Sequence, residues 1–357
     1  SLMLPRIVEN PGQEYDLPDR PFQGIPGIER TRQGRLYATF YSGGPDEGPE
    51  DFVVGFRSDD DGVSWSGPIV AVDHPHQLVR AFDPVLWRDP LDRLWLCWAQ
   101  SYDKFDGRCG VWCSICQDPD ADEPEWNEPR RIANGIMMNK PTVLRDGTWL
   151  FPAAIWADHV FPSDLNSIPE EKYSNVYVSL DEGKTFSRLG GADVRNRWFD
   201  EHMIVEKKDG RLWMLVRTQN GVGQSFSEDG GRTWSPGTDT GWGGPNSRFF
   251  IRRLASGNLL LVNHAVSTSR TDLTAFLSLD DGLSWPYSLL LDERASVSYP
   301  DGVEDEDGNI YIIYDRERYG AKEILLAKFT EKDIMSGEVV APQSRLKQLV
   351  HTASRKG

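Results

Sequence analysis

The chain has 357 residues, of which 39% are hydrophobic and 26% charged, so it can bury a sizeable core and is not a disordered polypeptide. Its 39 Lys and Arg against 55 Asp and Glu give a net charge of -16, and no basic tract interrupts that balance, which argues against nucleic acid and anionic membranes as partners. No apolar run approaches the length of a membrane-spanning helix.

Residues 1–6 lack the charged and then apolar pattern of a secretion signal, so a cytoplasmic location is expected, although a secreted protein with its signal removed would look the same. The four cysteines, Cys97, Cys109, Cys113 and Cys116, are too few and too clustered for a disulfide framework. No second cysteine pair or nearby histidine completes a zinc site. We therefore expect buried thiols and no bound metal.

Strands dominate the predicted secondary structure. Short aromatic and aliphatic segments bounded by turn residues recur at 35–41, 94–98, 212–216 and 310–314. Long helical periodicity is missing, and only residues 323–336 are ambiguous between helix and strand. The 33 Gly and 23 Pro supply the turns that an all-β chain needs.

Two interleaved repeats predict the fold. The first is a tight turn of the form polar–Gly–x–aliphatic that leads into a strand, and it recurs about every 50 to 60 residues. Its copies are at 33–36, 146–150, 209–212, 256–259 and 307–310, with a glycine-free variant at 91–94. Six copies at this spacing are typical of a propeller with four-stranded blades.

The second repeat has the form Ser-x-Asp-x-Gly-x-Thr/Ser-Trp/Phe. Its copies are 58–65, 179–186, 227–234 and 278–285, and a degenerate one ends at 125–129. The Asp is expected to accept hydrogen bonds from turn N–H groups, the Gly to supply a positive φ, and the aromatic residue to pack between sheets. Each copy is therefore predicted to form a hairpin that is stable by its own local contacts.

These repeats are Asp-boxes, and the chain resembles the sialidase (neuraminidase) superfamily of six-bladed propellers from about residue 20 to residue 330. The resemblance implies an all-β, six-bladed β-propeller of four-stranded antiparallel blades with Asp-box hairpins. We expect residues 1–19 to be an N-terminal extension, 20–345 a single catalytic propeller and 346–357 a C-terminal tail. Asp-boxes also occur in propellers that are not sialidases, so they indicate fold better than function.

Segments just before the innermost strands of a propeller converge on its axis. The six lead-in segments are 23–26, 82–84, 139–141, 200–202, 246–248 and 299–301. Purely structural positions would favour Val, Ile or Leu, whereas five of the six segments carry ionisable or phenolic groups, among them Asp83, Lys140, Arg248 and Asp301. We predict a binding pocket where they meet.

The resemblance assigns roles residue by residue. Sialidases use a tyrosine nucleophile with a glutamate partner, and Tyr299 and Glu201 have the matching positions. Arg217 and Arg270 are similar to two of the three arginines that bind the substrate carboxylate. The acid/base aspartate is expected in the loop 44–51, where Asp46 and Glu47 are nearest the expected place and Glu50 is a third candidate.

The start of blade one departs from the family. The Arg-Ile-Pro motif at the start of blade one is replaced by Gly24-Ile25-Pro26, so its arginine is missing. Arg80 and Lys140 are candidates to supply the lost charge. The departure leaves the identity of the acidic sugar open.

The chemistry of a tyrosine nucleophile suits an acidic sugar. A carboxylate on the anomeric carbon repels an Asp or Glu nucleophile, whereas a phenol stays neutral until a carboxylate takes its proton. A second carboxyl group protonates the leaving oxygen, arginines bind the substrate carboxylate, and no cofactor is needed.

Three functional hypotheses follow. The first is an exo-acting, retaining, sialidase-like glycoside hydrolase that removes a terminal sialic acid or related acidic sugar. The second is a propeller hydrolase of a neutral or uronic glycan that uses two carboxylates, such as Asp83 and Glu201. The third is a glycan-binding propeller without catalytic activity. The sequence does not predict the oligomeric state.

Overall fold

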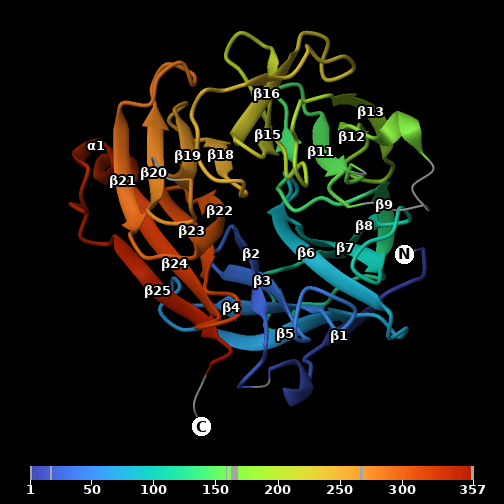
Figure 1. Cartoon of the computed structure of the whole chain (residues 1–357). Coiled ribbons are helices and arrows are strands. Elements are labelled where there is room, and N and C mark those ends of the chain that lie inside the picture. The colour runs from blue at the N-terminus through green and yellow to red at the C-terminus, as the bar shows by residue number, and fades with distance from the viewer. Residues whose placement is uncertain (1, 17, 158, 162–167, 266–267, 355–357) are drawn as a thin grey trace.

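The computed structural model describes residues 2–16, 18–157, 159–161, 168–265 and 268–354, and within them the strands form six antiparallel sheets around a common centre (Figure 1). Blade 1 contains β2 (Gln23–Arg30), β3 (Leu36–Ser42), β4 (Phe52–Ser58) and β5 (Ser66–Asp73), and blade 2 contains β6 (Val79–Arg88), β7 (Leu94–Tyr102), β8 (Gly110–Cys116) and β9 (Arg130–Asn134). Blade 3 contains β10 (Thr142–Val143), β11 (Trp149–Ala154), β12 (Ser174–Ser179) and β13 (Ser187–Ala192), and blade 4 contains β14 (Met203–Glu206), β15 (Leu212–Thr218), β16 (Gly221–Ser227) and β17 (Thr238–Asp239). Blade 5 contains β18 (Phe250–Arg253), β19 (Leu259–His264), β20 (Leu273–Ser278) and β21 (Tyr287–Asp292), and blade 6 contains β22 (Val297–Glu304), β23 (Asn309–Arg316), β24 (Glu323–Thr330) and β25 (Arg345–Thr352). The prediction of an all-β six-bladed propeller is confirmed.

The propeller extends beyond the boundaries that the sequence predicts. β1 (Arg6–Glu9) lies within the expected N-terminal extension, yet it pairs with β5 and adds a fifth strand to blade 1. β25 includes most of the expected C-terminal tail and is the outer strand of blade 6. The expected limits of 20 and 345 must therefore be widened at both ends, because short outer strands without a turn repeat are not visible in the repeat pattern.

The four repeat hairpins share one hydrogen-bond pattern. In the first copy, Ser58 Oγ donates to Asp60 Oδ1 at 2.8 Å, and the N–H groups of Gly62 and Ser64 donate to Ser58 Oγ and Asp60 Oδ1, both at 2.8 Å. The equivalent bonds recur in the copies at 179–186, 227–234 and 278–285. Hydroxyl and N–H donors lower the pKa of Asp60 to about 2, so this carboxylate stays charged over the physiological range.

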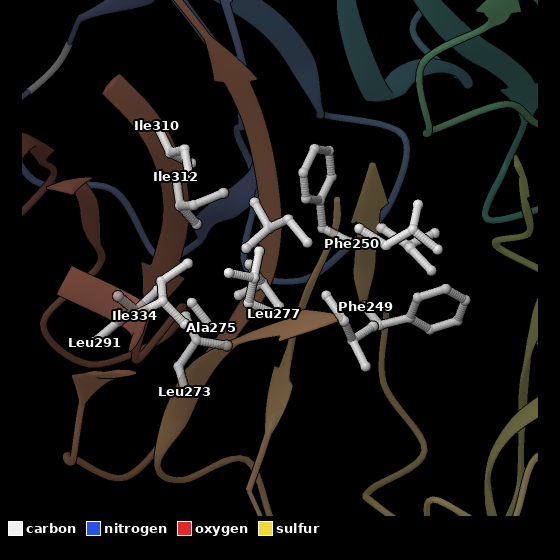
Figure 2. Close-up of a cluster of buried hydrophobic side chains, with 14 of the residues drawn as sticks. Phe249, Phe250, Leu273, Ala275, Leu277, Leu291, Ile310, Ile312 and Ile334 are labelled. Atoms are coloured by element: carbon white, nitrogen blue, oxygen red, sulfur yellow. The ribbon is translucent and has the colours of Figure 1, made fainter. Parts of the chain in front are cut away.

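Apolar residues fill the space between neighbouring blades. Figure 2 shows one such cluster between blades 5 and 6, with Phe250 from β18, Leu277 from β20 and Ile312 from β23. Ile334 of α1 (Glu331–Ser336) also packs there, and Thr330 caps this helix. Residues 323–336, ambiguous from the sequence, are therefore a strand followed by a short helix.

The cysteine prediction is wrong for one pair. Cys97 of β7 and Cys113 of β8 are directly opposite each other in the strand register and form a disulfide, whereas Cys109 and Cys116 are buried free thiols. Spacing in the sequence does not show which residues are cross-strand neighbours. Separately, no helix in the described part of the chain is long and apolar enough to span a membrane.

Candidate active site

The lead-in segments bring their side chains to the axis by unusual backbone conformations. Ile25, Asp83, Glu201 and Tyr299 have φ values of 54°, 48°, 43° and 55°, a region that side-chain-bearing residues seldom adopt. In β2, β6 and β22 the strand register shifts at this point, as in a β-bulge. A bulge re-aims a side chain, and such strain, about 1–3 kcal/mol per residue, is concentrated at functional sites.

Tyr299, Glu201 and Arg217 form a closed triangle of hydrogen bonds. The Tyr299 hydroxyl donates to Glu201 Oε1 at 2.7 Å, and Arg217 Nη1 donates to the same oxygen at 2.8 Å and to the Tyr299 hydroxyl at 2.7 Å. Arg217 is held by Asn246, whose Oδ1 accepts from Nε at 2.6 Å and whose backbone oxygen accepts from Nη2 at 3.1 Å. Asn139 Nδ2 donates to the backbone oxygen of Glu201 at 2.8 Å, which fixes this residue from the next blade.

The electrostatics of this triangle suit proton transfer from the phenol. Burial raises the pKa of Tyr299 to about 12, although Arg217, Arg270 and Arg318 oppose the rise, so the resting phenol is neutral. Burial disfavours the charge on Arg217, but Glu201 and Tyr299 outweigh it and raise the pKa of Arg217. The neutral phenol therefore donates its hydrogen bond to a carboxylate that can accept the proton.

Two further guanidinium groups lie over the Tyr299 ring. The Cζ of Arg270 is 5.3 Å and that of Arg318 is 4.1 Å from the ring centroid. Arg270 Nη2 donates to the backbone oxygen of Asn246 at 3.3 Å, and no carboxylate pairs with it among the residues that the structure describes. Arg318 was not predicted from the sequence, because it follows a strand in a turn and belongs to neither repeat.

Arg248 also lies against the Tyr299 ring. It is fully buried, its Cζ is 5.0 Å from the Tyr299 ring centroid, and its guanidinium donates to the backbone oxygens of Pro26, Met138 and Tyr299 at 3.0, 3.1 and 2.8 Å. It therefore links blade 5 to segments of blades 1, 3 and 6 at the axis and holds the backbone of Tyr299. These bonds are to main-chain oxygens, and the contact of Arg248 with substrate stays a prediction.

Lys140 and Asp301 meet at a different place on the axis. Lys140 Nζ donates to the backbone oxygens of Ile28 and Leu86 and lies 3.3 Å from Glu29 Oε2 and 3.4 Å from Asp301 Oδ2. Asp301 Oδ2 also accepts from the Ile28 N–H at 2.8 Å. These bonds join blades 1, 2, 3 and 6 and engage the ammonium group of Lys140 with protein acceptors, and the substrate contacts of Lys140 and Asp301 stay predictions.

Arg80, the other candidate, is also engaged elsewhere. Its guanidinium stacks on the Phe82 ring at 3.6 Å, donates to the backbone oxygen of Lys104 and lies 3.6 Å from Asp51 Oδ2. Asp51 ends the loop that carries the acid/base candidates. Arg80 therefore anchors this loop rather than contacting Tyr299.

The two acid/base candidates face different partners. Asp46 pairs with Lys104 at 2.7 Å and accepts from the Tyr319 hydroxyl at 2.8 Å, and these bonds lower the pKa of Asp46 to about 2. Glu47 Oε1 instead lies 3.6 Å from Nη1 of Arg318, which stacks on Tyr299. A general acid must hold a proton near the operating pH, so the low pKa of Asp46 counts against that residue, and Glu47 is the candidate that faces the side chains around Tyr299.

Asp83 is a buried carboxyl group beside the triangle. Burial raises its pKa to about 8, although Arg80 opposes the rise, so Asp83 is protonated at neutral pH. The folded pKa exceeds the unfolded value of about 3.9, so its contribution to stability is full at low pH and is lost as the pH rises from about 4 to 8.

Between pH 5 and pH 8.5, the melting temperature should fall less in Asp83→Asn than in the wild type. The two falls should differ by about 2 °C or more. Differential scanning calorimetry at both pH values measures the difference. Asp307→Asn removes an exposed carboxyl group and is the matched control. Equal slopes in the wild type and Asp83→Asn would contradict a neutral Asp83.

Comparisons with known proteins agree with this architecture. Residues 34–312 match the family described as BNR repeat-like domain. The chain is 32% identical to the sialidase of Micromonospora viridifaciens over 154 residues, which cover 40% of this chain but only 23% of that protein. The solved structure of Hadza microbial sialidase Hz136 superposes with a TM-score of 0.70 at 20% identity, covering 92% of this chain and 69% of that one. The α-L-arabinanase of Penicillium chrysogenum superposes with a TM-score of 0.60 at 14% identity, covering 93% and 99%. Because the family match spans most of its length, the chain belongs to the family of BNR repeat-like domains.

Proposed function

We propose that the protein is a retaining exo-glycoside hydrolase that removes a terminal sialic acid or a related acidic sugar, with Tyr299 as its nucleophile. The observation that carries the proposal is the hydrogen bond of 2.7 Å from the Tyr299 hydroxyl to Glu201 Oε1. Arg217 Nη1 donates a hydrogen bond to each of these two oxygen atoms. The similarity to sialidases supports a glycoside hydrolase. The likeness to an arabinanase shows that the fold is shared with an enzyme named for another sugar, so the site must decide the substrate.

In the first step, Tyr299 Oη attacks the anomeric carbon while its proton passes to Glu201 Oε1. The bond to the leaving oxygen breaks as a carboxylic acid, assigned here to Glu47, protonates it. Arg217 stabilises the charge that develops on Tyr299 and Glu201. In the second step, water deprotonated by Glu47 displaces the tyrosine from the sugar, and the phenol recovers its proton from Glu201, which gives net retention.

The first test is fluorophore release from an aryl α-sialoside by the purified protein. We expect turnover, with the α-anomer of the free sugar as the first product in a time-resolved NMR spectrum. A well-folded protein that neither cleaves this substrate nor binds sialic acid would overturn the proposal.

The assignment of the acid/base residue makes a separate prediction. Glu47→Gln should lower kcat/KM for an alkyl sialoside by about 100-fold or more, because its poor leaving group needs protonation, and should lower it much less for an activated aryl sialoside. Asp46→Asn, at the adjacent position, is the matched control and should change both values only a few-fold. The reverse order of effects would transfer the role to Asp46.

A second candidate is hydrolysis of a neutral glycan by two carboxyl groups. It is favoured by one observation: Asp83, with a pKa of about 8, is a protonated carboxyl group close enough to Glu201 to feel its charge. Activity on a neutral aryl glycoside that survives Tyr299→Phe and is lost in Asp83→Asn would support this candidate over the first.

A further inference from the structure

The space beside Gly24 is already filled. A Cβ added to Gly24 would lie 2.9 Å from both Cγ and Cδ of Arg318 and 3.0 Å from Asp315 Oδ2. Carbon atoms in contact prefer separations of about 3.5–4.0 Å, so even an alanine would displace the arginine stem. Gly24 thus leaves room for a side chain that comes from another blade.

Arg318 reaches this space from the turn between β23 and β24. The turn is held by main-chain bonds from Glu317 N to Ser296 O at 3.0 Å and from Lys322 N to Glu317 O at 2.8 Å. The backbone oxygen of Arg318 also accepts from the N–H of Gln23 at 3.1 Å, next to Gly24. The main chains of blades 1 and 6 are therefore joined beside Gly24 and Arg318. This bond fixes the backbone position from which the Arg318 side chain extends.

The guanidinium of Arg318 is oriented but not saturated. Nε donates to Asp315 Oδ2 at 2.9 Å and Nη2 to Ser298 Oγ at 3.2 Å, while the group stacks 4.1 Å from the Tyr299 ring centroid. Nη1 forms an ion pair with Glu47 Oε1 at 3.6 Å and makes no hydrogen bond to the residues that the structure describes. Because this pair is too long for a hydrogen bond, the N–H donors of Nη1 remain for a ligand.

We propose that Arg318 binds the carboxylate of the substrate in place of the arginine missing at position 24, and that Gly24 and Arg318 are a matched pair. The inference rests on the proposed function only in requiring an acidic sugar. Arg270, over the same ring and without a carboxylate partner in the described chain, supplies a second cation. Asp315 orients the group, because its Oδ2 accepts from Arg318 Nε and from the N–H of Ile25 at 2.8 Å.

The experiment compares the wild type with Arg318→Ala, Gly24→Arg/Arg318→Ala and Arg316→Ala. The last variant removes an arginine of β23 that pairs with Glu317 and Glu323, so it is the control for lost charge. The measurements are kcat and KM for the aryl α-sialoside, and the Kd of 2-deoxy-2,3-didehydro-N-acetylneuraminic acid, an acidic sugar that binds without turnover.

Arg318→Ala should raise KM and Kd by about 10- to 100-fold, because a charged hydrogen bond to the carboxylate is lost. Gly24→Arg/Arg318→Ala should recover about a third or more of the affinity that Arg318→Ala loses. If Arg318 served only to support the Tyr299 ring, an arginine at position 24 would not restore binding. Arg316→Ala should bind as the wild type does.

Three results would overturn the inference. An Arg318→Ala protein with reduced kcat but unchanged KM and Kd would make the residue a support for Tyr299 and leave the proposed function intact. A double variant that binds no better than Arg318→Ala would show that the two positions are not interchangeable. A wild type that neither cleaves the sialoside nor binds the probe would overturn the proposed function together with this inference.

Discussion

Replacing Tyr299 with phenylalanine is expected to lower kcat on the aryl α-sialoside by at least about 1000-fold. The change removes one oxygen atom and leaves the ring, which Arg248, Arg270 and Arg318 surround, in place. Binding should therefore survive. Without the hydroxyl, no covalent bond to the sugar forms, and Glu201 loses the proton that it would accept.

The measurement is single-turnover and steady-state kinetics together with the Kd of 2-deoxy-2,3-didehydro-N-acetylneuraminic acid. Tyr314, buried in β23 with its hydroxyl donating to Asp292 at 2.9 Å, offers a matched Tyr→Phe control away from the site. We expect Tyr314→Phe to keep kcat within a few-fold of the wild type. Tyr299→Phe with near-normal turnover would exclude the tyrosine mechanism even if the sialoside is a substrate.

The repeats made the fold predictable because each blade repeats the same local chemistry. A Gly in a tight turn and an Asp that accepts N–H groups are visible in the sequence, whatever surrounds them. The same periodicity placed Tyr299 and Glu201 in lead-in segments near the axis, whereas Arg217 and Arg270 were predicted from the resemblance to sialidases. The structure brings these four together.

The direction of a side chain at the axis was not predictable from the same pattern. Lys140, Asp301 and Arg248 occupy lead-in segments, yet they bond backbone groups of neighbouring blades. Bulges and positive φ values decide which side chains meet around Tyr299, and neither leaves a periodic signal. Position in a repeat thus indicated nearness to the axis but not function.

Arg318 was missed for a related reason. It lies in a non-repeating turn, whereas the replacement charge was predicted at Arg80 or Lys140, in the next blades along the chain. One signal was available: a glycine stands where the resemblance expects an arginine, and blade 6 closes the ring beside blade 1. An arginine in the last blade's turn was therefore a spatial neighbour of Gly24 although it is far away in the sequence.

Replacing Arg217 with methionine is the second change with a large expected effect, because it acts on stability as well as on turnover. Arg217 and Glu201 are both buried, and they are joined at 2.8 Å. Methionine fills similar space but leaves the Glu201 carboxylate without its cation. Breaking a buried pair on one side costs about 3–5 kcal/mol at neutral pH. We expect a loss of that size in the free energy of unfolding, with kcat lowered by at least about 100-fold.

The pH dependence of that loss identifies its cause. Without Arg217, the Glu201 carboxylate is a buried charge with no cation beside it, and this cost falls only on its ionised form in the folded state. The destabilisation of Arg217→Met relative to the wild type should therefore be larger at pH 7.5 than at pH 4.5. Urea unfolding at pH 4.5 and pH 7.5 measures this difference. Arg211→Met, which breaks the exposed pair with Asp209, is the control and should change stability little at either pH.

A double variant completes the test. Arg217→Met/Glu201→Gln replaces both charges, so it should be more stable than Arg217→Met at pH 7.5, and its stability relative to the wild type should no longer vary with pH in this range. If the two substitutions instead add, or if the loss in Arg217→Met is the same at both pH values, then the cost comes from packing and the lost bonds to Asn246. If the double variant is instead more stable than Arg217→Met, as expected, the Arg217–Glu201 pair is present in the protein despite the free-energy cost of burying two charges. Such a cost is expected where the pair serves the reaction, because a neutral pair of the same shape would stabilise the axis equally well.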